Sequence, residues 1–195
     1  MTDEHRDERM DERSMKERML AGDPYITDEE IAADQVRAQR LMAAYNSSSA
    51  EDPGLRRQIL EELLDEVGEE TEIRPPFHVD YGDRIRVGAR VFANYGLTAL
   101  DVATITIGDD VQIGPHVQLL TPTHPLEPGP RRDKWEGALP ITIGDNVWLG
   151  GGIIVLPGVT IGADTVVGAG SVVTKDLPAR VLAVGNPAKV VRSLD

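Results

Sequence analysis

The chain has 195 residues and a mass of 21.2 kDa, enough for one domain with a small appendage. Only 4% of the residues are aromatic, so the core must be packed mainly from aliphatic side chains. The chain contains no cysteine, which excludes disulfides, thiolate metal sites and a cysteine nucleophile. No apolar run reaches about 18 residues and the N-terminus is charged throughout, so we expect a soluble, cytoplasmic protein with no membrane partner.

The net charge of −13 is concentrated in the N-terminal third. Residues 1–72 hold 21 acidic and 9 basic residues, whereas residues 73–195 hold 12 and 11. An acidic surface repels phosphate backbones, which argues against nucleic-acid binding. A solvated acidic face is one explanation of the charge. The 16 Arg against 4 Lys suggest a second hypothesis, a halophilic protein whose self-repulsion is screened by a salt-rich cytoplasm.

The N-terminal 72 residues divide into a tail and a helical segment. Residues 1–13 alternate acids and arginines, which predicts a disordered acidic tail. Residues 14–72 form the predicted helical segment, and its first element is a short amphipathic stretch that ends at Gly22 and Pro24.

Two longer helices are expected after that stretch. A capping box of Thr27 and Glu30 opens a helix over about 28–45. A second helix over about 53–67 begins at Asp52–Pro53 and ends at Gly68. Apolar residues at helical spacing mark the buried faces: Ile31, Val36, Leu41, Met42 and Tyr45 in the first helix, and Leu55, Ile59, Leu63 and Val67 in the second.

From residue 73 the hydrophobic pattern changes to a period of six. This period fits no helix but contains three two-residue strand repeats. One short strand cannot bury its own apolar face, so the units must stack as a parallel β-solenoid from about 73 to 190, within a domain of residues 73–195. Fourteen aliphatic residues keep the register: Ile73, Val79, Ile85, Val91, Leu97, Ile107, Ile113, Leu119, Ile143, Leu149, Val155, Ile161, Val167 and Val173.

The six-residue register breaks twice, at 98–106 and at 120–142. The second break is rich in proline and charge and contains His124, so we expect an external loop that leaves the stack. Neutral imidazole is suited to act as a base near pH 7. Taken alone, however, His124 fits a solvated loop histidine before proline better than a catalytic base.

The repeat segments ITIGDNVWLGGG (141–152), LPGVTIG (156–162), GAGSVVTKDLP (168–178) and GNPAKVVR (185–192) resemble the hexapeptide-repeat acyltransferases. Five further segments narrow the resemblance to the maltose O-acetyltransferases and, slightly less, the galactoside O-acetyltransferases. They are MKERMLAGDPY (15–25), RAQRLMAAYNSS (37–48), VDYGDRIRVG (79–88), FANYGLTALDV (92–102) and THPLEP (123–128). The resemblance implies a mainly β fold, a left-handed parallel β-helix, and a homotrimer with active sites between subunits.

The resemblance also implies an activity and an acceptor site. The activity is acetyl transfer from acetyl-CoA to a sugar hydroxyl, with His124 as catalytic base and Asn94 contacting the acceptor beside it. Asp80 and Asp101 lie where the two branches differ, since the galactoside branch resembles Ser-Tyr-Gly and Asp-Asp there. Asp101 and Glu136 either bind sugar hydroxyls, orient His124, or are surface carboxylates, and Asn94 either holds a hydroxyl or satisfies a turn.

The positions implied for coenzyme A combine small residues, along which the pantetheine arm can lie, with bases that meet phosphate. Trp148 either flanks that arm or serves packing. The full set is Trp148, Gly151, Ala169, Thr174, Lys175, Lys189 and Arg192.

We therefore expect an acetyl-CoA-dependent sugar O-acetyltransferase that works by direct transfer in a ternary complex, because no cysteine or recognisable serine nucleophile is present to carry an acyl group. Four scattered histidines without cysteine predict no metal site. Two alternatives stay open. One is an acetyltransferase for another acceptor, such as a Nod-factor-like oligosaccharide, an amino sugar or a xenobiotic, and the other is a non-catalytic β-helix protein.

Overall fold

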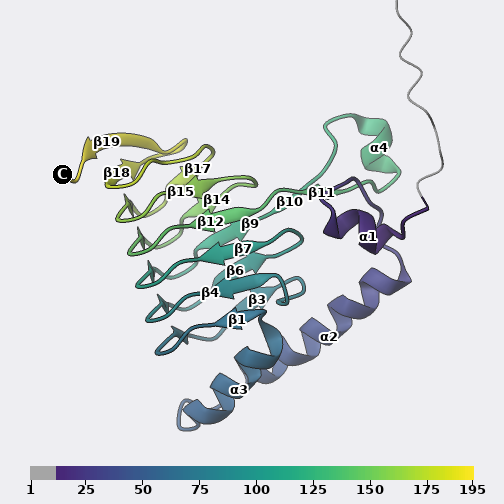
Figure 1. Cartoon of the computed structure of the whole chain (residues 1–195), viewed down its shortest axis with the longest axis horizontal. Coiled ribbons are helices and arrows are strands. Elements are labelled where there is room, and N and C mark those ends of the chain that lie inside the picture. Colours follow the sequence, from purple (N-terminus) through teal and green to yellow (C-terminus); the bar gives the residue numbers. More distant parts are fainter. Residues whose placement is uncertain (1–11) are drawn as a thin grey trace, which may run out of the picture.

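The computed structural model describes residues 12–195, which form a stack of three-sided coils with helices at its N-terminal end (Figure 1). Each coil contributes one short strand to each of three parallel sheets, so the chain passes three corners per coil. The corner from the first to the second sheet is called the first corner, that from the second to the third sheet the second corner, and that from the third sheet back to the first the third corner.

The first sheet contains β1 (Glu66–Val67), β4 (Ile85–Val87), β7 (Ile105–Ile107), β12 (Ile141–Ile143) and β15 (Thr160–Ile161). The second contains β2 (Glu72–Ile73), β5 (Phe92–Ala93), β8 (Gln112–Ile113), β13 (Trp148–Leu149), β16 (Val166–Val167), β18 (Val181–Val184) and the antiparallel β19 (Lys189–Ser193). The third contains β3 (Phe77–Val79), β6 (Leu97–Leu100), β9 (Gln118–Leu120), β14 (Ile154–Val155) and β17 (Val172–Val173).

The six-residue pattern produces this core directly. All fourteen register positions are at most 7% exposed, so the predicted parallel solenoid is confirmed. Strand pairing places like residues above one another, as with Ile107, Ile143 and Ile161 along the first sheet. The core is thus a column of aliphatic side chains from consecutive coils, and its apolar burial holds the stack together.

The solenoid begins one strand earlier than predicted, because the helix expected to reach residue 67 ends sooner. The helix α3 spans Pro53–Leu63, and the chain is already extended at Leu64. Residues 66 and 67 instead pair with β4, and the Gly68 N–H donates to the Val87 carbonyl. A Cβ at Gly68 would lie 2.3 Å from the backbone of the next coil, so this glycine permits close stacking and does not end a helix.

The other helices agree with prediction in position and differ in detail. The short stretch is α1 (Met15–Leu20), and the helix predicted over 28–45 is α2 (Glu29–Asn46). The cap of α2 is Asp28, whose carboxylate accepts from the Ile31 N–H at 3.0 Å, so the predicted Thr27–Glu30 capping box is wrong. Val36 and Leu55 were assigned to buried faces, yet they are 65% and 43% exposed.

The long helices α2 and α3 cover the N-terminal end of the stack (Figure 1). Tyr45 of α2 donates to the Ile73 carbonyl and meets Phe77 edge to face, with ring centroids 6.5 Å apart. The Asn46 side chain bonds both the N–H and the carbonyl of Phe77. These contacts seal the first coil, whose lower face would otherwise be open to water.

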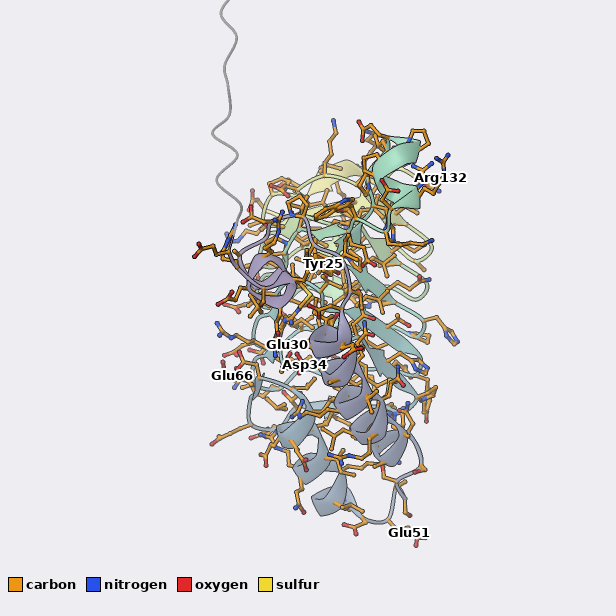
Figure 2. All side chains as sticks on the ribbon, turned by 90° about the vertical axis from the view of Figure 1, so that its right-hand side faces the viewer. Tyr25, Glu30, Asp34, Glu51, Glu66 and Arg132 are labelled. Carbon is orange, nitrogen blue, oxygen red and sulfur yellow. The ribbon has the colours of Figure 1, made fainter. Side chains whose placement is uncertain are left out.

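The external loop leaves the stack after β9, as predicted. It starts and ends with a small antiparallel pair, β10 (Pro122–Thr123) with β11 (Gly137–Ala138), and contains the short helix α4 (Pro128–Arg132). Figure 1 shows the loop projecting beside α1, and Figure 2 shows Arg132 standing away from the coils. The loop and the N-terminal segment are therefore neighbours in space although they are far apart in sequence.

The predicted tail, residues 1–13, lies outside the described residues apart from its last two positions. Of these, Arg13 forms an ion pair with Asp23 at 2.8 Å. Within residues 12–195, no helix is long and apolar enough to cross a bilayer.

Candidate functional site

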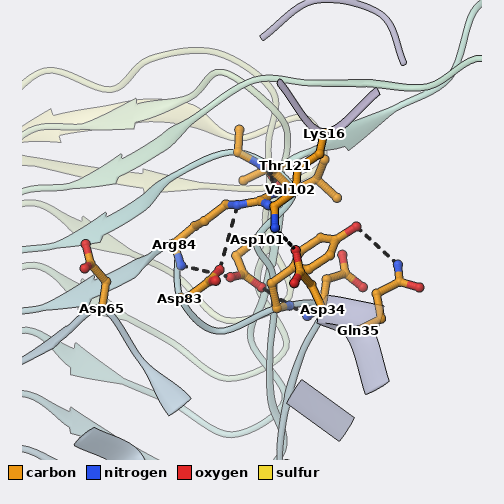
Figure 3. A network of polar contacts seen from close by, with 12 residues as sticks. Lys16, Asp34, Gln35, Asp65, Asp83, Arg84, Asp101, Val102 and Thr121 are labelled. Carbon is orange, nitrogen blue, oxygen red and sulfur yellow. Dashed lines mark hydrogen bonds and ion pairs between the residues drawn. The ribbon is translucent and has the colours of Figure 1, made fainter. Parts of the chain in front are cut away.

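The third corner has one polar residue per coil: Asp80 after β3, Asp101 after β6 and Thr121 after β9. Figure 3 shows Asp101 and Thr121 close to each other. Asp101 and Thr121 are 0% exposed, whereas Asp80 is half-buried. Residues at one corner of consecutive coils lie above one another. The pairing of β6 with β9 places Thr121 above Asp101, and with the half-buried Asp80 in the coil below they form a polar column at the third corner, although the residue directly below Asp101 is Tyr81.

Asp101 holds the turn of residues 80–84 through its carboxylate. One oxygen accepts from the backbone N–H groups of Asp80 and Tyr81 at 3.1 and 2.9 Å, and the other from that of Arg84 at 3.3 Å. Burial raises the pKa of Asp101, and the backbone N–H groups oppose that rise by stabilising the anion. Because Asp101 is 0% exposed, it is not a surface carboxylate, and the backbone of the turn occupies both of its oxygens.

Thr121 makes the corresponding link one coil higher. Its hydroxyl donates to the Leu100 carbonyl at 2.6 Å and accepts from the Ala103 N–H at 3.0 Å. Thr121 is also the last residue before β10, where the external loop departs. The column therefore connects the turn that carries Asp80 with the start of the loop that carries His124.

Asp80 is the half-buried member of the column. Burial raises the pKa of Asp80 to about 6, and the carboxylates of Asp101 and Glu136 contribute to the rise, while Arg84 opposes it. The backbone N–H of Asp80 donates to Asp101, whereas its carboxylate makes no hydrogen bond or ion pair within residues 12–195 and is available for a ligand. A carboxylate in this setting accepts hydrogen bonds from sugar hydroxyls.

Glu136 is joined to the N-terminal segment through Tyr25. The two residues exchange backbone hydrogen bonds of 3.1 and 2.9 Å, and the Tyr25 hydroxyl donates to the Glu136 carboxylate at 3.0 Å. Tyr25 is 1% exposed, and its pKa is raised first by burial and then by Glu136. Figure 2 shows Tyr25 close to α1. Glu136 is therefore a fixed group in the loop.

His124 immediately follows β10 and is exposed in the single chain. Thr123 pairs with Gly137 in the antiparallel ladder, so the next residues, His124 and Glu136, take opposite positions where the two strands part. Glu136 therefore lies between Tyr25 of the N-terminal segment on one side and His124 of the β10 segment on the other. The imidazole thus lies at the edge of the third corner, open to a ligand.

Asn94 lies at the second corner, between β5 and β6, where its side-chain oxygen accepts from the Tyr95 N–H at 2.8 Å. The four-residue strand β6 separates that corner from the third, a span of about 13 Å at about 3.3 Å per residue. A single chain therefore does not bring Asn94 to His124.

The residues expected to bind coenzyme A occupy the upper coils. Gly151 and Ala169 lie at the second corner, where the Gly170 N–H donates to the Gly151 carbonyl at 2.9 Å. Thr174 and Lys175 are exposed at the third corner, two coils above the departure of the loop. Lys189 and Arg192 are exposed on β19, where Arg192 pairs with Leu182 in the ladder.

Trp148 is 57% exposed on the outer face of the second sheet, paired with Gln112 below and Val166 above. Its ring is outside the core, so packing within the single chain does not explain it. The position is open to a ligand or to another subunit.

Sequence reasoning did not single out Tyr25, Tyr81, Arg84 and Gln35. Tyr81 is 1% exposed, its hydroxyl accepts from the Gln35 amide at 3.2 Å, and Arg84 lies over its ring at 4.3 Å. The available signal was composition, because the chain has only four tyrosines and two of them fall in the MKERMLAGDPY and VDYGDRIRVG segments. Their partners are distant in sequence, which no local pattern reveals.

A cavity of about 740 Å³ lies elsewhere, under α2 and α3, and is lined by residues that include Arg56, Arg57 and Tyr95. The guanidinium of Arg57 donates to the carbonyls of Val67 and Gly68, and that of Arg56 to Ser48, so these cations serve the fold. Within residues 12–195, no group of three or more potential metal ligands is gathered.

Comparison with known families agrees with this architecture. Residues 18–68 match the maltose acetyltransferase hexapeptide capping motif, and residues 140–175 match the bacterial transferase hexapeptide of six repeats. The chain is 40% identical to the galactoside O-acetyltransferase of Escherichia coli, over 93% of this chain and 90% of that protein. It is 48% identical to nodulation protein L of Rhizobium meliloti, over 91% and 98%.

Two solved structures have the same fold over nearly their whole length. A maltose O-acetyltransferase from Clostridium difficile superposes with a TM-score of 0.92 at 41% identity, covering 94% of this chain and 98% of the other. A galactoside acetyltransferase in complex with coenzyme A superposes with a TM-score of 0.90 at 38% identity, covering 94% and 92%.

The fold and the matched segments define a hexapeptide-repeat acyltransferase with a left-handed parallel β-helix, and both predictions are confirmed. The chain belongs to the maltose and galactoside O-acetyltransferase family. It is accordingly an acetyltransferase, and the non-catalytic alternative is set aside.

Proposed function

We propose that the protein transfers an acetyl group from acetyl-CoA to a sugar hydroxyl, with His124 as general base. The observation that carries this proposal is the order of groups along the third corner. Asp80 lies at the first coil, His124 leaves the stack at the third, and Thr174 and Lys175 lie at the fifth. An acceptor held near Asp80 and a donor held near Lys175 would meet at the imidazole.

The chemistry follows from that order. As the sugar oxygen attacks the thioester carbonyl, His124 takes the hydroxyl proton. The C–S bond then breaks, and the leaving thiolate takes the proton back from the imidazolium, so the ester and free coenzyme A are formed with no acyl-enzyme. Glu136, opposite His124 and fixed by Tyr25, is placed to stabilise the imidazolium.

Lys175, Lys189 and Arg192 are proposed to meet the phosphates of the donor, with Gly151 and Ala169 beside the pantetheine arm and Trp148 against it. All three bases are exposed on a chain whose net charge is −13, so they offer local attraction to phosphate on an otherwise repulsive surface. The similar galactoside acetyltransferase structure has coenzyme A bound, which supports a donor of this kind.

The proposal includes a homotrimer with active sites between subunits. Asn94 is at the second corner and His124 at the third, so a site that uses both must take them from two chains. Apolar and aromatic residues on the outer face of the second sheet, such as Phe92, Trp148 and Val166, are suited to contact with another copy of the chain.

The acceptor is proposed to be a maltose- or glucose-type sugar. Val102, 6% exposed, stands in the LDV segment where the galactoside branch resembles Asp-Asp, which removes one potential carboxylate from the acceptor side. An oligosaccharide or amino-sugar acceptor is the second candidate, favoured by the 48% identity to nodulation protein L.

A free-thiol assay of coenzyme A release tests the proposal. The purified chain is given acetyl-CoA with maltose, glucose, galactosides, glucosamine or chloramphenicol, at low and high salt. Release that requires an acceptor and saturates with a sugar is expected. Saturation with chloramphenicol alone would overturn the sugar assignment, and the absence of release with every acceptor, from a folded sample, would overturn the proposed activity.

A further inference from the structure

We propose that Asp101 is a positioning residue for the acceptor: its buried carboxylate fixes the turn of residues 80–84 and thereby the place of Asp80. The inference rests on the proposed function, and it assigns to Asp101 a role different from sugar contact or orientation of His124.

The first support is the number of bonds that converge on one side chain. Three backbone N–H groups from a five-residue turn donate to the Asp101 carboxylate, at 2.9 to 3.3 Å (Figure 3). Charge-assisted bonds of this kind are roughly twice as strong as neutral ones, and full enclosure strengthens them further. The turn therefore has one preferred geometry as long as the carboxylate is present.

The second support is that the far end of the turn is tied to the same place. The Arg84 guanidinium donates to the Val102 carbonyl at 2.8 Å, next to Asp101 in the chain. Gly82 has a φ of +80°, and a Cβ there would lie 2.5 Å from the Leu63 carbonyl, so the turn is also pressed against the end of α3. The backbone of the turn is thus held at both ends and in the middle, and the Asp80 carboxylate projects from this fixed backbone.

The third support is the link to the loop. Thr121 bonds the carbonyl of Leu100 and the N–H of Ala103, the segment that contains Asp101, and it precedes β10 directly. The positions of Asp80 and of the loop that carries His124 are thus set by one continuous set of short bonds. Loosening Asp101 should displace Asp80 relative to the imidazole without disturbing the donor side, because Thr174 and Lys175 lie three coils above Asp101.

The test compares Asp101→Asn with wild type in steady-state kinetics, using the best acceptor from the thiol assay. The amide keeps the shape, loses the charge and turns an N–H toward backbone donors, so the turn loosens. The KM for the acceptor should rise about tenfold or more, because a misplaced polar group loses its bond, while the KM for acetyl-CoA changes less than about twofold.

Thr165→Val is the matched control. Thr165 is also 0% exposed, and its hydroxyl donates to the Pro178 carbonyl at 2.8 Å, but it lies near the first corner of an upper coil. This variant loses a buried bond in the same kind of setting, and both KM values should stay near wild type. If Asp101→Asn changes the two KM values in parallel, or leaves the acceptor KM unchanged, the positioning role is overturned.

Two further measurements keep the outcome decisive. If Asp101→Asn does not fold, Arg84→Met loosens the same turn from its other end and should give the same selective rise in acceptor KM. Amide hydrogen exchange of residues 80–84 should be faster in the Asp101 variant and unchanged in Thr165→Val; equal protection would refute the link even in a protein that acetylates no sugar. A wild-type protein without acetyl transfer, in contrast, overturns the proposed function.

Discussion

The first and third corners of the solenoid contain the same kind of hydrogen bond, from a backbone N–H to an aspartate carboxylate, but the first corner is exposed and the third is buried. At the first corner, the carboxylates of Asp109 and Asp145 each accept from a backbone N–H of the preceding coil, at 2.8 and 2.9 Å. Asp101 does the same at the third corner. The side chain of Asp109 is 52% exposed, whereas Asp101 is 0% exposed, so burial and not bonding type separates the two corners.

The pKa values of the aspartates differ between the two corners in the same way. At the first corner, the bidentate pair of Arg90 with Asp110, at 2.7 and 2.8 Å, lowers the pKa of the Asp110 carboxyl. At the third corner, burial raises the pKa of both Asp80 and Asp101. Where the six-residue repeat is intact, polar residues form regular ladders in water. At the third corner, Asp101 and Thr121 lie inside the two breaks of the register and are fully buried, and buried titratable groups with shifted pKa values are common at functional sites.

The largest difference between the corners should appear at His124. His124→Ala removes the proposed base, so kcat should fall about 10²- to 10⁴-fold while the oligomer and the far-UV circular dichroism spectrum are retained. His78→Ala, an exposed histidine on β3, is the matched control and should keep wild-type turnover. Unchanged turnover in His124→Ala would remove the third corner from the mechanism.

The hydrogen bonds of the first corner form within one chain. The site at the third corner, in contrast, is expected to need Asn94 from a second chain. Co-expression of His124→Ala with Asn94→Ala tests this, because some interfaces then combine the intact histidine of one subunit with the intact asparagine of its neighbour. Random mixing in a trimer should restore about a quarter of the wild-type rate. If both residues act from the same chain, mixing restores nothing, since each chain carries one defect.

Asp80→Asn removes a half-buried carboxyl at the third corner, so it should change how the free energy of unfolding depends on pH. The folded-state pKa is about 6 against an ordinary 3.8, so the folded state binds more protons than the unfolded state between these values. The free energy of unfolding therefore falls as pH rises from about 4 to 6, and stays lower above that, by on the order of 1 kcal/mol after allowance for solvent screening. The variant should unfold at a higher temperature than wild type at pH 7.5 and not at pH 4.

Thermal melts of both proteins across that range are the measurement. A wild-type advantage at pH 7.5 would mean that the Asp80 carboxylate is stabilised by a partner, which contradicts its placement among other carboxylates.

The sequence predicted the features that follow from the six-residue period, namely the coils and the external loop. It predicted much less of the features that depend on contacts between distant residues. The repeat of Ile107, Ile113 and Leu119 fixes a coil because each residue needs the same neighbour above and below. The repeat also indicates where the external loop lies, because a segment that departs from the six-residue register must leave the stack of coils. The capping residue of α2 was assigned one position early, because Thr27 and Asp28 are both good caps and only the helix geometry selects between them.

The candidate site was predictable only in part for a related reason. The sequence singled out His124, Asp80 and Glu136 as candidates, but it did not indicate that Glu136 bonds Tyr25, which is 111 residues away. Asp101 falls in a break of the register, where no periodicity indicates which way a side chain points. Its enclosure depends on the turn of the coil below, so its role as a turn anchor emerges only in three dimensions.

The smallest effect is expected at the first corner, from Arg90→Ala. This change removes the pair with Asp110, in which both side chains are about half exposed, so water and salt already weaken the attraction. The melting temperature should change less than in Asp80→Asn, and the difference from wild type should vanish in molar salt while turnover is unaffected. The same salt series tests the halophilic hypothesis, which requires the wild-type melting temperature to rise steeply with salt. A large loss of stability that salt does not reduce would mean that the first corner is more than a solvated ladder, and the contrast with the third corner would no longer hold.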